Sequence, residues 1–289
     1  MIERVTFFES DCNYDEADIV IFGAPFDSTT SYRPGTRFAS RTMRAESYGL
    51  EYYSPGQDVD LSEINFFDAG DLDLPFGDTK KTLIEIENYV AEVMADEKFP
   101  LMIGGEHLLT LAPVSVAHRK FSDLAIIHFD AHADLRDNYL GVELSHATVM
   151  HRIFDLVGDD SIFQFGIRSG DKSEFEFAKA HTKLNLFDFK GLEEVAKKIQ
   201  GRPVYFTVDL DVLDPSAFPG TGTPEAGGVT FIDLLKASFK VFDLCNVVGC
   251  DLMELSPPYD PSGISTATAL KILREFLIRI NMNFKTSNF

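Results

Sequence analysis

The chain has 289 residues, of which 45% are hydrophobic, enough for one large α/β domain or two small ones. Its net charge of −20 argues against a nucleic-acid-binding protein, because phosphate contacts need clustered Lys and Arg. The same charge argues against docking on anionic lipid, and no apolar run approaches the roughly 18 residues of a membrane span. An acidic chain of this kind is highly soluble, and its field also attracts cationic substrates.

Cysteine usage and the first residues point to a cytoplasmic protein. The chain contains three cysteines, Cys12, Cys245 and Cys250, and no CxxC motif. An odd, scattered set is typical of reduced thiols. The N-terminal residues do not combine a basic region with a following apolar core, so no secretory signal is evident. We therefore expect a cytoplasmic location.

Short apolar runs alternate with amphipathic stretches along the whole chain. The apolar runs predict strands at residues 18–23, 65–68, 101–103, 124–130, 162–167, 184–186, 204–208 and 247–252. Apolar residues spaced by three and four predict helices at residues 36–49, 79–96, 108–120, 146–157, 173–181, 192–199, 230–242 and 264–279. We expect Thr79 to be an N-cap, and Thr230 with Asp233 to form a capping box.

The alternation of strands and helices predicts parallel crossovers and a doubly wound sheet. No Pro/Gly/Ser-rich linker, repeat or low-complexity tract divides the chain, so we expect a single domain over residues 1–289. In such a sheet, ligands bind beyond the carboxyl ends of the strands, where the strand order reverses. His107, Asp130, Asp209 and Glu254 all follow predicted strands.

Six side chains of metal-binding type occur in three short clusters, each directly after a predicted strand. Unpaired charge at the end of a buried strand is costly to desolvate, so these clusters need a reason. Four carboxylates and two imidazoles are too many for one ion with open coordination positions, and they suit two hard divalent cations that share carboxylates. The candidate metal ligands are His107, Asp130, His132, Asp134, Asp209 and Asp211.

The spacing within the clusters allows these side chains to converge. If the backbone stays extended, residues i, i+2 and i+4 point to one side, which groups Asp130, His132 and Asp134. Carboxylates bridge two cations and imidazole nitrogens do not, so we expect His107 and His132 to bind different ions. The oxygen-rich set favours Mn²⁺, with Fe²⁺, Co²⁺ and Zn²⁺ as alternatives. Two such ions lower the pKa of a shared water, which predicts hydrolysis.

Each cluster alone has a simpler explanation. An isolated Asp-x-Asp pair or a single His after two glycines is a weak signal. An EF-hand at residues 209–214 fails, because Gly is missing at the sixth position of the loop and Glu at the twelfth. The combination of three clusters at strand ends is what predicts a binuclear site.

At these residues the chain resembles the ureohydrolases, the family of arginase and agmatinase. The likeness extends over nearly the whole chain and is greatest to agmatinases, through residues 134–137 followed by Ser145, His146 and Ala147. Ala147 stands where many agmatinases have Gly. The similar segments are residues 23–27, 32–37, 104–107, 129–134, 145–148, 209–215, 222–228 and 251–254.

The resemblance implies a three-layer α/β/α sandwich with a mainly parallel sheet of about eight strands, assembled as trimers or hexamers. It also implies two Mn²⁺ ions per subunit, with Asp130 and Asp209 as bridging ligands. One ion would be held by His107, Asp130, Asp134 and Asp209. The other would be held by Asp130, His132, Asp209 and Asp211.

The resemblance also implies three catalytic side chains. Glu254 would pair with the guanidinium nitrogens of the substrate, because a carboxylate matches that planar donor set. Asp134 would carry a proton from the attacking hydroxide to the leaving amine. His146 would exchange protons with bulk water, although a structural hydrogen bond at a helix start is a simpler role for it.

The expected substrate is a small cationic guanidine. The segment between Asp134 and His146 lacks the Ser/Thr-rich donors with which an arginase would hold an α-carboxylate, and Asp137 and Glu143 would repel that group. Arg136 would attract it. Agmatine, which ends in an ammonium group, suits an acidic mouth, so we expect hydrolysis to putrescine and urea. Arginine, guanidinobutyrate and formimidoylglutamate are the alternatives within the family.

Two other classes compete with this prediction. A deacetylase-like amidohydrolase would use one Zn²⁺, and the complete second set of ligands argues against it. A non-catalytic scaffold would be marked by a lost ligand or by the loss of Glu254, and none is lost.

The remaining histidines, three arginines and two glycine pairs have structural explanations. His128 is expected to bond within the strand layer, and the helical His118, His151 and His181 to be solvated or locally paired. The glycine pairs 104–105 and 227–228 are expected to allow close backbone approach rather than to bind phosphate. Structural ion pairs are expected for Arg33, Arg37 and Arg168.

Overall fold

The computed structural model describes residues 5–284, and its centre is an eight-stranded sheet in the order β4-β1-β5-β10-β9-β6-β7-β8. Every neighbouring pair in this sheet is parallel. The strands are β1 (Ile19–Gly23), β4 (Phe66–Asp71), β5 (Phe99–Ile103), β6 (Ala125–Phe129), β7 (Ile162–Ile167), β8 (Lys183–Leu186), β9 (Pro203–Asp209) and β10 (Asn246–Met253). A separate antiparallel hairpin joins β2 (Tyr53–Ser54) to β3 (Val59–Asp60).

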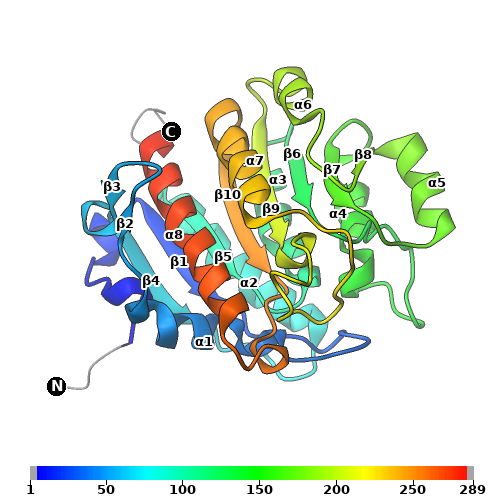
Figure 1. Cartoon of the computed structure of the whole chain (residues 1–289). Helices are drawn as coiled ribbons and strands as arrows, with labels where there is room; N and C mark the ends of the chain where they lie inside the picture. Colours follow the sequence, from blue (N-terminus) through cyan, green and yellow to red (C-terminus); the bar gives the residue numbers. More distant parts are fainter. Residues whose placement is uncertain (1–4, 285–289) are drawn as a thin grey trace.

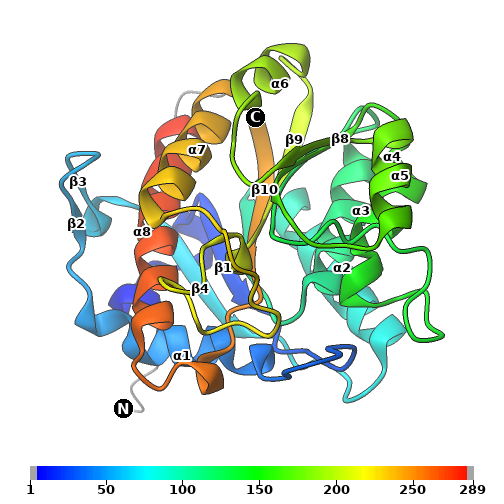
Figure 2. The ribbon, with the colours of Figure 1, turned by 45° about the vertical axis from the view of Figure 1, so that its right-hand side comes forward.

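Helices cover both faces of the sheet and complete three layers (Figure 1). The first face carries α1 (Ala39–Glu46), α6 (Leu192–Lys198), α7 (Phe231–Leu244) and α8 (Ile264–Phe284). The other face carries α2 (Thr79–Ala95), α3 (Leu111–Lys120), α4 (Val149–Val157) and α5 (Lys172–His181). Figure 2 shows the two helical layers on either side of the strands. Among residues 5–284 no helix has the length and apolar character needed to cross a membrane.

The strands separate two apolar cores because their side chains alternate between the faces. On β6, for example, Ile127 and Phe129 belong to the core under α7 and α8, and Ile126 belongs to the core under α2 and α3. Nearly every strand residue in the middle of the sheet is buried, as expected for a parallel sheet covered on both faces. This rigid sheet holds the loops at its carboxyl edge.

The prediction of a mainly parallel, eight-stranded α/β sandwich is confirmed. All eight predicted strands occur within a few residues of their expected positions, but the β2–β3 hairpin was not predicted. The cap prediction at Thr79 is wrong: Asp78 caps α2, and its side chain accepts a hydrogen bond from the amide of Lys81. Thr230 does cap α7, by accepting from the amide of Asp233, but the predicted capping box is not formed, because the Asp233 carboxylate accepts from the Thr230 hydroxyl and not from its amide.

The order of the strands explains where the predicted site lies. The four central neighbours, β5, β10, β9 and β6, are the strands that precede or contain the chemical motifs. His107 follows β5, Glu254 follows β10, Asp209 ends β9 and Asp130 follows β6. Since carboxyl ends of parallel strands meet at one edge, residues more than a hundred positions apart in the sequence become neighbours there.

Candidate metal centre and active site

Three predicted metal ligands surround the imidazole of His107, itself the fourth. This residue opens the short 3₁₀ helix His107–Thr110, directly beyond β5. Its Nδ1 lies 3.0 Å from Oδ2 of Asp130, and 3.4 Å and 3.3 Å from the nearest oxygens of Asp134 and Asp209. All four side chains are buried. The structure therefore brings together the whole first predicted set.

A second group forms around His132. Its Nδ1 lies 3.0 Å from Oδ2 of Asp211 and 3.4 Å from Oδ1 of Asp130. The two oxygens of Asp130 thus face different histidines, Oδ2 toward His107 and Oδ1 toward His132. This is the arrangement of a bridging carboxylate. Asp209 groups with His107 through Oδ2, while its Oδ1 accepts a hydrogen bond from the amide of Asp211 at 2.8 Å.

Asp130, His132 and Asp134 converge, but not through the extended backbone that their spacing predicted. β6 ends at Phe129, and Asp134 adopts a left-handed backbone with φ of 53°. The segment is held instead by Ser169, which pairs with His132 and accepts a hydrogen bond from the amide of Ala133. Non-glycine residues with positive φ are uncommon and concentrate at functional sites.

The donor set fits divalent cations. Nδ1 of His107 is buried and has no hydrogen-bond partner among residues 5–284, although three carboxylate oxygens lie within 3.4 Å of it. Burial, together with the charges of Asp211 and Asp130, raises the pKa of Asp209 well above its usual range. Crowded, buried carboxylates of this kind are stable as anions only beside positive charge. Hard oxygen ligands with two imidazoles suit Mn²⁺-type ions.

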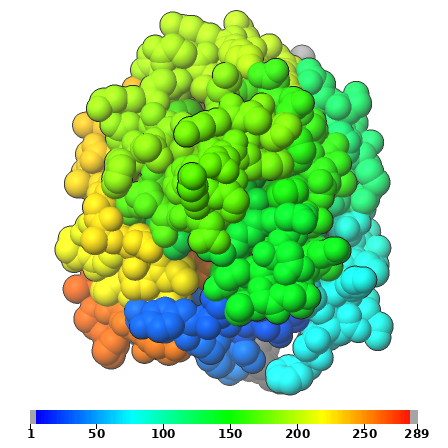
Figure 3. Space-filling view, turned by 90° about the vertical axis from the view of Figure 1, so that its right-hand side faces the viewer, coloured from blue at the N-terminus to red at the C-terminus, as the bar shows by residue number. Residues whose placement is uncertain are grey.

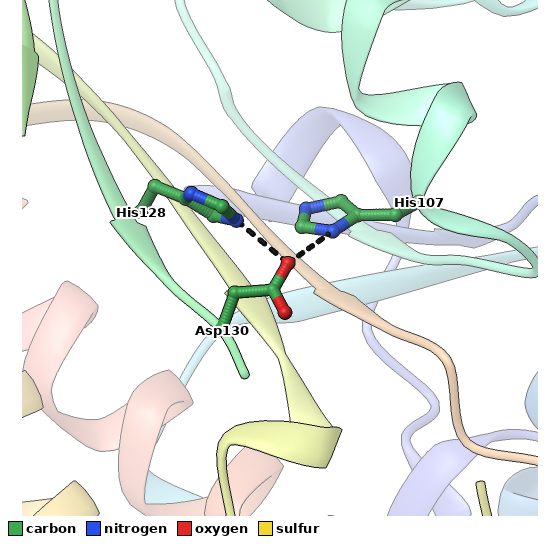
Figure 4. A group of neighbouring side chains, drawn as sticks. All are labelled: His107, His128 and Asp130. Atoms are coloured by element: carbon green, nitrogen blue, oxygen red, sulfur yellow. Dashed lines mark hydrogen bonds and ion pairs between the residues drawn. The ribbon is translucent and has the colours of Figure 1, made fainter. Parts of the chain in front are cut away.

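His128 contacts this group without belonging to it (Figure 4). Its Nε2 lies 2.8 Å from Oδ2 of Asp130, and its Nδ1 lies 3.1 Å from the side-chain nitrogen of Gln164. Both ring nitrogens are therefore engaged by protein groups, and neither is available to an ion. The expectation that His128 bonds within the strand layer is confirmed, but its partner is the carboxylate that spans the two groups.

A cavity of about 310 Å³ opens above the predicted ligands. Its walls come from several parts of the chain, including Ser31, Tyr139, Ser169 and Thr223. The segments that carry these residues (blue, green and yellow) all reach the face shown in Figure 3. His107, His132, Asp134 and Asp209 lie in the cavity wall, so a bound molecule touches the centre directly.

Glu254 lines the same cavity, as predicted. It follows β10 with a left-handed backbone, φ of 64°, and is nearly fully buried. Its Oε1 accepts a hydrogen bond from the amide of His107 at 2.7 Å. Burial raises its pKa well above the usual range. A buried carboxylate held in this way is a strong partner for a cationic group, because a cation would relieve the cost of its desolvation.

His146 also lines the cavity, and its backbone is tied to the segment that carries Ser31. Its amide donates to the hydroxyl of Thr29 at 3.1 Å, and its Nε2 lies 3.4 Å from the hydroxyl of Ser31. Glu106, fully buried beside His107, accepts from both the amide and the hydroxyl of Thr29. This role of Glu106, as acceptor for the segment that carries Thr29, was not predicted. Its only signal in the sequence is its place beside a predicted ligand.

Burial, and after it the neighbouring His132, lowers the pKa of His146 to about 4. The imidazole is therefore neutral at pH 7. A neutral imidazole offers a free lone pair at the cavity wall, as a proton shuttle requires, but a pKa of about 4 makes it a weak base at pH 7.

The rim of the cavity holds three charged residues, of which only Arg136 was expected near the substrate. Asp137 and Glu143, which were also expected there, do not line the cavity. The guanidinium of Arg136 pairs with Asp171 and lies 3.3 Å from a carboxylate oxygen of Glu174. All three line the cavity. Asp171 and Glu174 follow β7, the next strand outward from β6, and that position was the signal available in the sequence.

The other expectations have mixed outcomes. Arg37 pairs with Asp27, as predicted, whereas Arg33 stacks on Tyr259. Arg168 donates to backbone carbonyls, including those of Asp211 and Glu225, and forms no ion pair with the described residues, contrary to expectation.

Close backbone approach at the glycine pairs is confirmed. A Cβ on Gly105 would lie 1.9 Å from the carbonyl oxygen of Phe26, and a Cβ on Gly228 would lie 2.4 Å from the amide of Asp214. Both glycines flank loops that carry site residues. Only a residue without a side chain fits there.

Comparison with known proteins agrees with this geometry. The chain is 48% identical to an agmatinase of Bacillus anthracis over 276 residues, covering 94% of this chain and 95% of the relative. It is 32% identical to a guanidinobutyrase of Pseudomonas aeruginosa over 287 residues, covering 95% and 90%. The crystal structure of the agmatine ureohydrolase of Thermoplasma volcanium superposes with a TM-score of 0.90 at 31% identity, covering 100% of this chain and 98% of that one.

The match to the arginase family extends over residues 17–278. That range includes every strand of the sheet and every predicted metal ligand. The chain therefore belongs to the arginase family, and it is a ureohydrolase.

Proposed function

We propose that this enzyme hydrolyses agmatine to putrescine and urea. The observation that carries the proposal is the cavity in which buried carboxylates, Glu254 among them, lie beside the centre spanned by Asp130. The 48% identity to an agmatinase over nearly the whole chain supports the choice of agmatine within the family. A guanidinium group at the bottom and an ammonium group at the rim match the charges that line the cavity.

The rim supports a cationic tail. Arg136 carries one positive charge and is flanked by two carboxylates, Asp171 and Glu174, so the three together carry one net negative charge. An ammonium group at the end of a flexible chain satisfies that excess. An α-carboxylate at the same place would add a further negative charge beside Asp171.

The arginase family depends on a binuclear metal centre, and we propose two Mn²⁺ ions for this enzyme. His107, Asp130, Asp134 and Asp209 would hold one ion, and Asp130, His132, Asp209 and Asp211 the other. When bound, two such ions supply Lewis acidity that makes a water between them nucleophilic near neutral pH. The absence of cysteine from the donor set supports Mn²⁺ over a thiolate-type zinc site.

The side chains of the chain itself orient the substrate and move protons. Glu254 would accept hydrogen bonds from two guanidinium nitrogens and so hold the central carbon above the metal centre. Asp134, in the cavity wall, would take the proton released on attack and pass it to the departing amine. His146, neutral at pH 7, would exchange that proton with water at the cavity mouth.

The experiment that tests the function is a urea-release assay with Mn²⁺, run in parallel on agmatine, arginine and guanidinobutyrate. We expect agmatine to give the highest kcat/KM, by at least about tenfold, since the tails differ by a full charge at the rim. A preference for arginine, or no release from any guanidine, would contradict the proposal.

Guanidinobutyrate is the second candidate, for one reason. Arg136 lies in the cavity wall, and rotation away from Asp171 would let it pair with a substrate carboxylate. The guanidinobutyrase relative is 32% identical. The variant Arg136→Gln separates the candidates: it should spare agmatine turnover and abolish any turnover of guanidinobutyrate.

We further propose that residues 1–289 form a single domain, that the enzyme is cytoplasmic, and that it assembles as a homotrimer or hexamer. The sheet supports a single domain, because its central strands come from both halves of the chain. The scattered free cysteines support a cytoplasmic location. Size-exclusion chromatography with light scattering tests the third, and a monomeric mass for the active enzyme would contradict it.

A further inference from the structure

A row of polar side chains crosses the centre of the sheet beneath the metal centre. Gln164 on β7 is in register with His128 on β6, His128 with Thr207 on β9, and Thr207 with Asp251 on β10. All four residues are fully buried, on the face covered by α2 and α3. We call these four residues the polar row.

A stable sheet does not require polar residues at this level. Two positions earlier on the same strands, the side chains that point to the same face are Ile162, Ile126 and Tyr205. Buried polar groups cost free energy unless they are hydrogen-bonded, and apolar side chains of similar size would stabilise the core at least as well. The polar row therefore needs a reason beyond folding.

One half of the row fixes the orientation of Asp130. The amide nitrogen of Gln164 donates to the carbonyl of Ala133 at 2.8 Å, and its oxygen accepts from Thr182. This orientation directs an N–H of Gln164 at Nδ1 of His128, so Nδ1 is an acceptor and the proton lies on Nε2. Nε2 then donates to Oδ2 of Asp130 at 2.8 Å (Figure 4).

The other half acts on His107. Asp251 accepts hydrogen bonds from the hydroxyls of Thr110 and Tyr205, each at 2.9 Å. Because Thr110 gives its single proton to Asp251, the Thr207 hydroxyl donates to Oγ1 of Thr110, 3.4 Å away, and accepts from Nε2 of His107, 2.9 Å away. The proton of His107 therefore lies on Nε2, and the lone pair on Nδ1 faces the carboxylate cluster.

We infer that the polar row is a positioning device for the metal centre. His128 and Gln164 hold Asp130, which faces both groups of ligands, and Thr207 and Asp251 hold His107, which faces only one. The inference rests on the proposed binuclear centre. It predicts different effects for the two halves: loss of His128 weakens both ions, and loss of the Thr207 hydroxyl weakens one.

Isothermal titration of Mn²⁺ into the metal-free full-length protein tests this. Thr207→Val, nearly isosteric, should weaken one of two binding events by about tenfold or more and leave the other unchanged. His128→Leu should weaken both events and reduce the spin-coupled Mn²⁺ signal in electron paramagnetic resonance. His128→Gln, which keeps a donor at a similar reach, should restore most of the affinity.

Two matched substitutions control for burial. Thr82→Val removes a buried hydroxyl on α2 that bonds only the carbonyl of Pro75 among the described contacts. His118→Leu makes the same exchange as His128→Leu at a half-buried position in the last turn of α3, and so controls for the exchange itself. Both controls should bind two Mn²⁺ with wild-type affinity.

The result that overturns the inference is a folded Thr207→Val protein, with the circular dichroism spectrum of the wild type, that binds both ions with wild-type affinity. The Mn²⁺ titration of Thr207→Val tests the positioning role of the polar row even if His128→Leu does not fold. The proposed function fails separately: wild-type protein that binds two Mn²⁺ and hydrolyses no guanidine refutes the activity and leaves the titration valid.

Discussion

Asp130 connects the two groups of predicted metal ligands, since each of its oxygens faces a different histidine. Asp130→Asn keeps the shape of the side chain and removes its charge. We expect the variant to lose bound Mn²⁺ and urea release together, by at least about 100-fold, because both ions lose an anionic ligand. Metal analysis beside the urea assay measures both quantities.

Asp137→Asn is the matched control, an exposed Asp of the same segment that pairs with Arg152. It should keep both metal and activity. Full activity of Asp130→Asn without bound metal would refute the assignment of Asp130 as a ligand.

Glu254 is proposed to bind the guanidinium group of the substrate and is not a predicted metal ligand. Its substitution should therefore lower turnover and leave metal binding unchanged. In Glu254→Gln the amide oxygen can still accept the hydrogen bond from His107, which keeps the local backbone in place. Charge-assisted hydrogen bonds contribute about 1.5–3 kcal/mol, so kcat/KM should fall by roughly 10- to 100-fold. Metal content should stay at the wild-type level, and Glu143→Gln, an exposed site, should change neither. Unchanged kcat/KM would remove Glu254 from the substrate pocket.

Single residues differ in how visible they are in the sequence. The metal-type residues stand out because charged side chains directly after apolar runs need a reason, as at Asp209, the last residue of β9. His128 and Gln164 do not stand out: their contact depends on the register between β6 and β7, which no local pattern encodes. Arg136 and Asp171 pair across a loop, and only the fold brings them together.

At the scale of elements, the loop after β5 depends on Gly105. A Cβ there would meet backbone atoms of Phe26, which cannot rotate away as a side chain can. Gly105→Ala should therefore shift the loop that carries His107, lower the free energy of unfolding by about 1–3 kcal/mol and weaken Mn²⁺ binding. Gly49→Ala, where no atom lies within 4 Å, should do neither. Equal denaturation midpoints for the two variants would contradict this account.

The loop after Asp211 is held by Asp214, which accepts hydrogen bonds from Ser216, Gly227 and Gly228. The bonds from Ser216, chiefly, lower the pKa of Asp214 from 3.8 to about 2. Because the folded pKa is the lower one, the stabilisation is present above pH 4 and is lost as the pH falls toward 2.

The free energy of unfolding should therefore be higher for the wild type than for Asp214→Asn at pH 6. The difference should shrink steadily between pH 4 and pH 3. Urea denaturation at each pH measures it, and a difference independent of pH would show that the ionised carboxylate has no part in holding the loop.

Whole elements were predictable where hydrophobic patterning determines them. Apolar runs flanked by turns revealed the eight strands of the sheet. The β2–β3 hairpin was missed because its strands have two residues each, too few for an alternating pattern. Positive φ at Asp134 and Glu254 was also not predicted, since it is uncommon in non-glycine residues and no local pattern marks where it occurs.

On the scale of the whole molecule, the strand order creates the site. The sequence indicates which strands carry chemistry, but not that β5, β10, β9 and β6 lie side by side, since these strands are far apart in the chain. Their adjacency gathers eight titratable side chains at one edge: His107, Asp130, His132, Asp134, His146, Asp209, Asp211 and Glu254. The net charge of −20 adds an acidic field around that edge, which favours a cationic substrate.

The most direct test of the account is the anomalous diffraction of crystals of the active enzyme grown with Mn²⁺. We predict two anomalous peaks per subunit, roughly 3.5–4 Å apart, with one oxygen of Asp130 directed at each. A single peak, or two peaks that Asp130 does not span, in a crystal whose dissolved protein releases urea from agmatine would contradict it.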